Sequence, residues 1–122
     1  MRKLKLQIQM SIDGYVARPN GEQDWMTWNP DDKLLEFINS LIDSSDTILL
    51  GRKMTDAFVS HWENAVKNNP ETPLAKKMVD TPKVVFTKTL EKSTWNNTTL
   101  AKGNLAEEIA NLKKQNGKDI IV

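Results

Sequence analysis

The clearest chemical signal in the sequence is a glycine followed by two cations, Gly51-Arg52-Lys53, directly after the hydrophobic run Thr47 to Leu50. Apolar residues then recur at helical spacing, so this segment predicts a buried strand that turns into a helix at Gly51. The first turn of a helix leaves backbone N–H groups unpaired, and the helix dipole adds positive potential there. With the two cations and the Thr55 hydroxyl, such a turn could bind a phosphate or pyrophosphate. The alternative is that Gly51 only permits the turn and that both cations are solvated.

Ring-bearing side chains form a second group of candidates. Trp25 and Trp28 lie in a polar loop, where a flat ring could wall a ligand pocket, although such rings also pack on cores. His61, the single histidine, comes late in a predicted helix, and this favours an exposed or capping position over a catalytic one. With one histidine and no cysteine, the sequence offers few of the usual metal ligands, so we expect no metal site.

Strands and helices alternate along the rest of the chain. Residues 4–10 alternate apolar and polar side chains, which is typical of a half-buried strand. Further strands are expected over 47–50, 83–87, 98–100 and 119–122. Helices are expected over about 31–43, from Gly51 to about 66, over 74–79, and from Asn104 to Asn116-Gly117. This order predicts an α/β fold with parallel crossovers.

Composition narrows the class of protein. The 122 residues suit one domain, 1–122, and 39% hydrophobic with 27% charged residues is typical of a globular chain. A formal charge of +1 provides no global field for nucleic acid or an anionic membrane, so we expect a small-molecule ligand at a local site. No stretch suits a membrane helix or a signal peptide, and this predicts a cytoplasmic location.

The final residues, Ile120-Ile121-Val122, read as the opening of another buried strand, so we expect the domain to be incomplete at its C-terminal side. Ligands of open α/β sheets bind at the carboxyl ends of the strands. Residues that follow Val122 in a longer chain would therefore belong to the site.

Four segments in this order resemble the dihydrofolate reductase superfold, and specifically the branch with the C-terminal reductase domain of the bacterial riboflavin-biosynthesis protein RibD. They are SIDGYVA (11–17), Asp24-Trp25, TILLGRKMT (47–55) and KVVFTKTL (83–90), and the likeness spans nearly the whole chain. The resemblance implies a three-layer α/β/α fold with a mostly parallel central sheet, truncated here on the C-terminal side. It also carries the expectation of a homodimer, which is common among riboflavin-type members.

The same resemblance implies an NADPH-dependent reductase. In the family, the turn after the second strand holds cofactor phosphates, the end of the next strand reaches the adenosine 2′-phosphate, and the S-x-D-G turn lies beside nicotinamide and substrate. Carried over to this sequence, the cofactor residues are Gly14, Ala17, Gly51, Arg52, Lys53, Thr55, Thr87 and Lys88. Ser11 and Trp25 are the candidate substrate residues.

The implied chemistry is hydride transfer from the nicotinamide to a C=O or C=N carbon of a pyrimidine- or pterin-like substrate, as in 5-amino-6-(5-phosphoribosylamino)uracil reductase. Asp13 or Asp24 would anchor the substrate or relay a proton, a role that requires a buried carboxylate near neutral pH. The alternatives are that Asp13 only builds a turn and that Asp24 is a solvated loop residue.

Two other functions stay open. Dihydrofolate reductases use a carboxylate near the start of the first helix, where this sequence has Lys33, with Asp31 and Asp32 off register. This difference favours the riboflavin-type branch over folate reduction. The other alternative is a non-catalytic nucleotide-binding or interaction domain, because a sheet with an unpaired edge invites strand addition.

Overall fold

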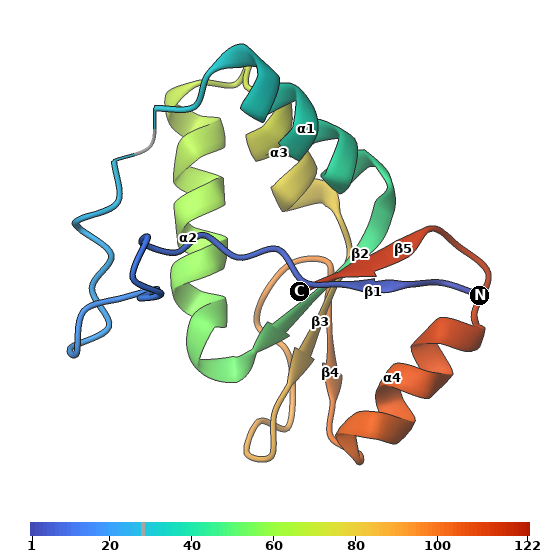
Figure 1. Ribbon diagram of the computed structural model, residues 1–122. Helices are drawn as coiled ribbons and strands as arrows, with labels where there is room; N and C mark the ends of the chain where they lie inside the picture. Colours follow the sequence, from blue (N-terminus) through green and yellow to red (C-terminus); the bar gives the residue numbers. More distant parts are fainter. Residues whose placement is uncertain (28) are drawn as a thin grey trace.

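The computed structural model describes residues 1–27 and 29–122, and it contains a five-stranded sheet and four helices within those residues (Figure 1). The strands are β1 (Leu4–Lys5), β2 (Ser45–Gly51), β3 (Lys83–Phe86), β4 (Thr98–Ala101) and β5 (Asp119–Ile121). The helices are α1 (Asp32–Asp43), α2 (Arg52–Asn68), α3 (Pro73–Asp80) and α4 (Leu105–Lys114).

All strand pairs are parallel, in the order β1-β5-β2-β3-β4. Helices α1, α2 and α3 lie on one face of the sheet and α4 on the other (Figure 1). The predicted parallel α/β fold in three layers is confirmed, because each crossover helix returns the chain to the same end of the sheet. None of the helices in the described residues is long and apolar enough to span a membrane.

Local sequence explains where the helices begin. The Asp31 carboxylate accepts a hydrogen bond from the Leu34 N–H at 2.8 Å and caps α1. The Asn104 side chain accepts from the N–H groups of Ala106 and Glu107 and caps α4. These caps satisfy donors that a helix leaves unpaired, and each is worth about 1 kcal/mol.

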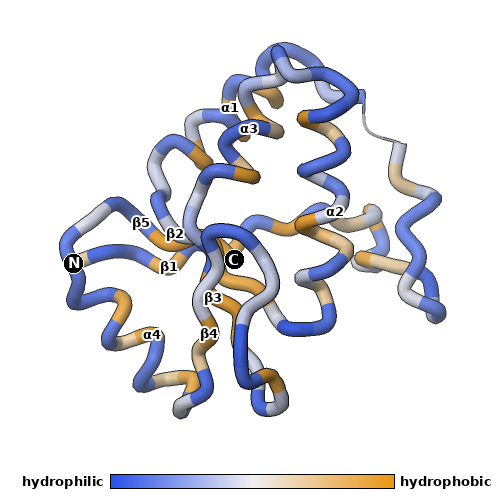
Figure 2. The backbone as a smooth tube through the Cα atoms, turned by 180° about the vertical axis from the view of Figure 1, so that it is seen from behind, coloured by the Kyte–Doolittle hydropathy of each residue, from blue (hydrophilic) through white to orange (hydrophobic). Residues whose placement is uncertain are grey.

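The core lies between the sheet and the three helices on its first face. It contains buried residues from α1, β2, α3, β3 and β5: Ile38, Ile42, Ile48, Leu50, Leu74, Val85 and Ile121. Strand β2 pairs with β3 on one side and β5 on the other, and residues Thr47 to Leu50 are buried, so the buried strand predicted for this run is confirmed. Hydrophobic stretches of the strands accordingly gather at the centre of the molecule (Figure 2).

The N-terminal strand is the main departure from the sequence prediction. A half-buried strand over residues 4–10 is wrong, because β1 ends at Lys5 and the side chains of Leu6, Ile8 and Met10 are 72%, 53% and 56% exposed. Strand β1 lies at the edge of the sheet and pairs only with β5 among the described strands. Beyond β1, the Gln7 N–H still donates to the Val122 carbonyl at 3.0 Å, next to the end of β5.

Arg2 ties this N-terminal edge to the amino ends of the strands. Its side chain is buried, and its guanidinium donates to the carbonyls of Leu112 and Lys118, to the Thr47 hydroxyl and to the Asp46 carboxylate. The planar fork of an arginine can satisfy all these acceptors at once. One side chain thus joins the N-terminus, β2, the end of α4 and the loop before β5.

Two titratable groups are perturbed by the fold, and both belong to its framework. Burial lowers the pKa of the Lys83 ammonium at the start of β3, against the opposing effect of Asp80 and Glu63. The hydrogen bond from Lys5 lowers the pKa of the Asp119 carboxyl at the start of β5, aided by the Lys3 backbone N–H. Both residues lie at the amino ends of their strands.

Candidate functional site

The carboxyl ends of three neighbouring strands bring the predicted phosphate-binding residues to one edge of the sheet. Gly51 pairs with Phe86, and Phe86 pairs with Ala101, so β2, β3 and β4 end at the same level. Arg52 and Thr87 are therefore the first residues beyond two adjacent strands, whose backbones run about 4.8 Å apart. In open α/β sheets this edge is the usual place for a ligand.

The β2–α2 turn has the features of an anion site. Gly51 occupies the N-cap of α2, and within the described residues no side chain caps that helix and no acid lies in its first turn. Arg52 and Lys53 are exposed, and the part of the chain that the structure describes provides neither with an ion-pair partner. Unpaired N–H groups, helix dipole and cations thus all favour a bound anion.

Gly51 itself has a conformation open to any residue. Its φ is −74°, and a Cβ built on it meets no atom of the described chain within 4 Å. The backbone conformation of the turn therefore does not require a glycine at this position. What glycine retains here is open space beside the first helical turn, where another molecule could approach the backbone closely.

Thr55 lies beneath this turn and not at its exposed rim. Its side chain is fully buried, and its hydroxyl donates to the Gly51 carbonyl at 3.0 Å. Because that bond closes the first turn of α2 from inside, Thr55 braces the backbone that would contact a phosphate.

The end of β3 adds a third cation beside the first two. Thr87 is buried, and its hydroxyl accepts from the N–H groups of Thr89 and Leu90 at 3.2 and 3.1 Å, which ends the strand at Phe86. Lys88 is exposed and has no ion pair among residues 1–27 and 29–122. By contrast, Lys102 after β4 lies 3.7 Å from a carboxylate oxygen of Glu91.

A tryptophan outside the predicted site links the β3–β4 connection to helix α2. The indole N–H of Trp95, in the β3–β4 connection, donates to the Asp56 carboxylate on α2 at 3.0 Å. Trp95 also packs against the core. The two residues are 39 positions apart, so neither spacing nor periodicity indicates their contact. His61 is exposed, as predicted, and its ring lies edge-on to Trp62 at 4.9 Å between centroids.

The N-terminal loop is organised by its own contacts. The Ser11 hydroxyl donates to Asp13 and accepts from the Tyr15 N–H, and Gly14 adopts a φ of +89° that suits glycine. Asp24 forms an ion pair with Arg18. Asp13 and Asp24 are both exposed, which supports turn-building and surface roles, while Ala17 and Trp25 are half-buried.

The structure thus assembles only part of the predicted site. It brings Gly51, Arg52 and Lys53 beside Thr87 and Lys88. Within the described residues, no hydrogen bond joins the loop of residues 11–27 to this edge, and the loop extends outward past α2 (Figure 1). The expectation for Trp28 falls outside the described residues.

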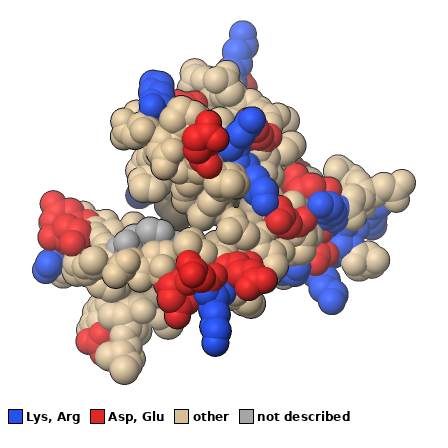
Figure 3. Space-filling view, turned by 90° about the horizontal axis from the view of Figure 1, so that it is seen from above, with Lys and Arg blue, Asp and Glu red and all other residues tan. Residues whose placement is uncertain are grey.

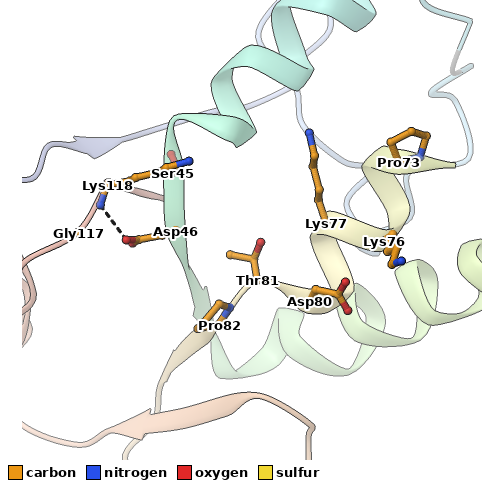
Figure 4. A pocket seen from close by; sticks show the side chains of 10 residues that line it. All are labelled: Ser45, Asp46, Pro73, Lys76, Lys77, Asp80, Thr81, Pro82, Gly117 and Lys118. Carbon is orange, nitrogen blue, oxygen red and sulfur yellow. Dashed lines mark hydrogen bonds between the residues drawn. The ribbon is translucent and has the colours of Figure 1, made fainter.

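A cavity of about 620 Å³ lies at the opposite edge, where β2 and β3 begin (Figure 4). Its lining includes Asp46, Lys77 and Lys118. Lys77 pairs with Asp43, and the Lys118 backbone N–H donates to Asp46 at 2.7 Å. We do not place the cofactor here, because α/β sheets bind ligands at the carboxyl ends of strands and these side chains already serve the framework.

Charge elsewhere is mixed. Acidic and basic side chains are interspersed on the face seen from above (Figure 3). No group of three or more His, Asp or Glu side chains in the described residues is arranged to hold a metal ion.

The parallel sheet and the cation-rich turn at its carboxyl edge define an α/β domain with the dihydrofolate reductase-like fold. The chain belongs to the RibD C-terminal domain family, whose model matches residues 2–122.

Two known proteins are similar to this chain. The chain is 33% identical over 119 residues to the uncharacterised protein YyaP of Bacillus subtilis (strain 168), an alignment that covers 98% of this chain and 61% of YyaP. Its fold is similar to the crystal structure of a proposed riboflavin biosynthesis protein from Shewanella sp. PV-4, with a TM-score of 0.66, 23% identity and coverage of 99% of this chain and 63% of that one. The chain thus spans about three fifths of the length of both proteins.

Proposed function

We propose that this chain is a bacterial, cytoplasmic reductase domain of the RibD type that binds NADPH at the carboxyl edge of its sheet. The observation that carries the proposal is the uncapped first turn of α2 at Gly51, flanked by Arg52 and Lys53, which have no ion-pair partners among the described residues. Family membership adds the expectation of a reductase.

Each residue of this edge has a separate task in the proposal. The N–H groups of the first helical turn bind the pyrophosphate, and Arg52 and Lys53 supply fixed charge beside it. Lys88 faces the 2′-phosphate, which distinguishes NADPH from NADH. Thr55 and Thr87 hold the two turns in place through the bonds that their hydroxyls form with the backbone. The bound cofactor supplies the hydride.

The proposed substrate is a small molecule with a C=O or C=N carbon that accepts the hydride, of the pyrimidine type used in riboflavin biosynthesis. The turn of Ser11, Asp13 and Gly14, with Ala17 and Trp25, is proposed to lie against nicotinamide and substrate when both are bound. Because Asp13 and Asp24 are exposed, proton delivery by either requires the substrate or further protein to cover it.

A second candidate is an interaction domain without catalytic activity. The exposed side chains of Leu6, Ile8 and Met10, which follow the edge strand β1, favour it, because exposed apolar surface favours association. The two candidates differ in whether the chain binds a dinucleotide.

The first test is a titration of the purified chain with NADPH and, separately, with NADH, in which isothermal titration calorimetry measures binding. We expect saturable binding that prefers NADPH and weakens about tenfold in Arg52→Ala, a change of about 1.4 kcal/mol. Lys114→Ala, an exposed lysine at the end of α4, is the matched control and should bind as the unaltered chain does. A folded chain that binds neither dinucleotide would favour the interaction domain.

A further inference from the structure

Asp56 is the acid best placed to neutralise the cations of the β2–α2 turn. It lies four residues after Arg52 and three after Lys53 on the same helix. Residues at these spacings are neighbours on a helix surface, where opposite charges ordinarily pair. Asp56 is exposed, so burial does not prevent such a pair.

The structure shows a different partner for this carboxylate. An Asp56 oxygen accepts the indole N–H of Trp95 at 3.0 Å, and no ion pair joins Asp56 to Arg52 or Lys53 among the described residues. The indole N–H can only donate, so it can bond to the carboxylate but not to the arginine or lysine side chains, which have no acceptor.

Trp95 is held in a position that makes this contact specific. Its ring is half-buried and packs against the core cluster between sheet and helices. Its backbone N–H donates to the Ser93 hydroxyl at 3.3 Å, within the connection that begins with Thr87 and Lys88. A packed ring with a fixed backbone offers its N–H group in one direction, at the first turns of α2.

We propose that Trp95 is a positioning residue for the phosphate site: it engages Asp56 and thereby leaves Arg52 and Lys53 available to an anion. The inference rests on the proposed function, because it assigns the phosphates to this turn. Without the indole N–H, Asp56 pairs with Arg52, and a phosphate has to displace that pair. An i, i+4 ion pair of ordinary strength corresponds to about a twofold change in affinity.

The test combines two substitutions with calorimetric titration of NADPH at low ionic strength. Trp95→Phe keeps an aromatic ring but removes the donor, and Asp56→Asn removes the charge but keeps an acceptor. We expect Trp95→Phe to raise Kd about twofold in the otherwise unaltered chain and to have no effect in the Asp56→Asn background. Equal weakening in both backgrounds would mean that Trp95 acts only by packing, and no weakening in either would also overturn the inference.

A second measurement separates this inference from the proposed function. In the ligand-free protein, the indole N–H signal of Trp95 in a ¹H–¹⁵N NMR spectrum is identified by its loss in Trp95→Phe. We expect Asp56→Ala to shift that signal more than the other indole signals, and an unchanged signal would refute the contact. If NADPH fails to bind, inorganic pyrophosphate is titrated into the same variants. The same pattern of effects would retain the positioning role of Trp95 but reject the dinucleotide as ligand. Absence of pyrophosphate binding would reject both the positioning role and the proposed function.

Discussion

Among single residues, Lys83 shows how a buried cation is used inside the framework. The residue is 3% exposed, and its ammonium donates to the carbonyls of Val79 and Thr81 at 2.9 and 2.8 Å. Those carbonyls belong to the last turn of α3 and the residue after it, where a helix leaves acceptors unpaired. Lys83 therefore joins the end of α3 to the start of β3, and its lowered pKa is the consequence of burial.

This burial predicts a pH dependence of stability. Because the pKa of Lys83 is lower in the folded chain than the ordinary 10.5, the unfolded chain binds more protons between those two values. The contribution of Lys83 to the free energy of unfolding should therefore rise with pH through that alkaline window. This contribution is the free energy of unfolding of the unaltered chain minus that of Lys83→Met, which urea unfolding at several pH values measures. A value that falls as the pH rises would contradict the assignment.

At the scale of elements, a substitution in the β2–α2 turn should affect ligand binding much more than stability. Gly51 has an ordinary φ and open space beside it, so Gly51→Ala introduces no clash within the described chain. Alanine is a poorer N-cap than glycine, but no side-chain capping bond is lost at Gly51 and alanine lowers the entropy of the unfolded chain, so the net cost should stay within about 0.5 kcal/mol. A ligand that approaches the backbone closely would nevertheless meet the new methyl group.

We therefore expect Gly51→Ala to unfold at nearly the same urea concentration and to bind NADPH about tenfold more weakly, or about 1.4 kcal/mol. Urea unfolding and calorimetry measure the two quantities. Asn104→Ala, at the N-cap of α4, is the matched control: it removes two capping hydrogen bonds and should lower stability by about 1 kcal/mol while leaving binding intact. Unchanged binding in Gly51→Ala would remove the phosphates from this turn.

At the scale of the whole molecule, the exposed apolar segment after β1 is the feature that a folded core does not explain. Leu6, Ile8 and Met10 are more than half exposed, and Ile12 beyond them is fully exposed. Exposed apolar side chains next to an unpaired sheet edge favour association. This is the surface through which we expect the homodimer that the family resemblance implies.

The corresponding substitution is Ile8→Lys, measured by sedimentation velocity. Because Ile8 is 53% exposed, the change should alter the free energy of unfolding by no more than about 0.5 kcal/mol and should shift the chain toward the monomer. Leu105→Lys, at a 62% exposed position on α4, is the matched control and should not change the sedimentation coefficient. If both variants sediment as the unaltered chain does, this segment is not the interface.

Local patterns in the sequence were sufficient for the elements and their order. Helical spacing predicted the helices, with Asn104 at the start of the last one. The buried run Thr47 to Leu50 predicted β2, and a β-branched and aromatic run predicted β3, because these features act between residues a few positions apart. The strand-to-helix turn at Gly51, at the carboxyl end of a buried strand, followed from the same patterns, and the strand pairing then showed that this strand is central.

Contacts between distant residues were decided only by the tertiary structure. The alternation over residues 4–10 predicts one apolar face but does not say what covers it, and the sheet leaves it exposed. The buried Arg2, the covered Thr55 hydroxyl and the bond from Trp95 to Asp56 likewise depend on segments that meet only when the sheet is assembled. Periodicity describes one element at a time, whereas burial and hydrogen-bond partners are properties of how elements pack together.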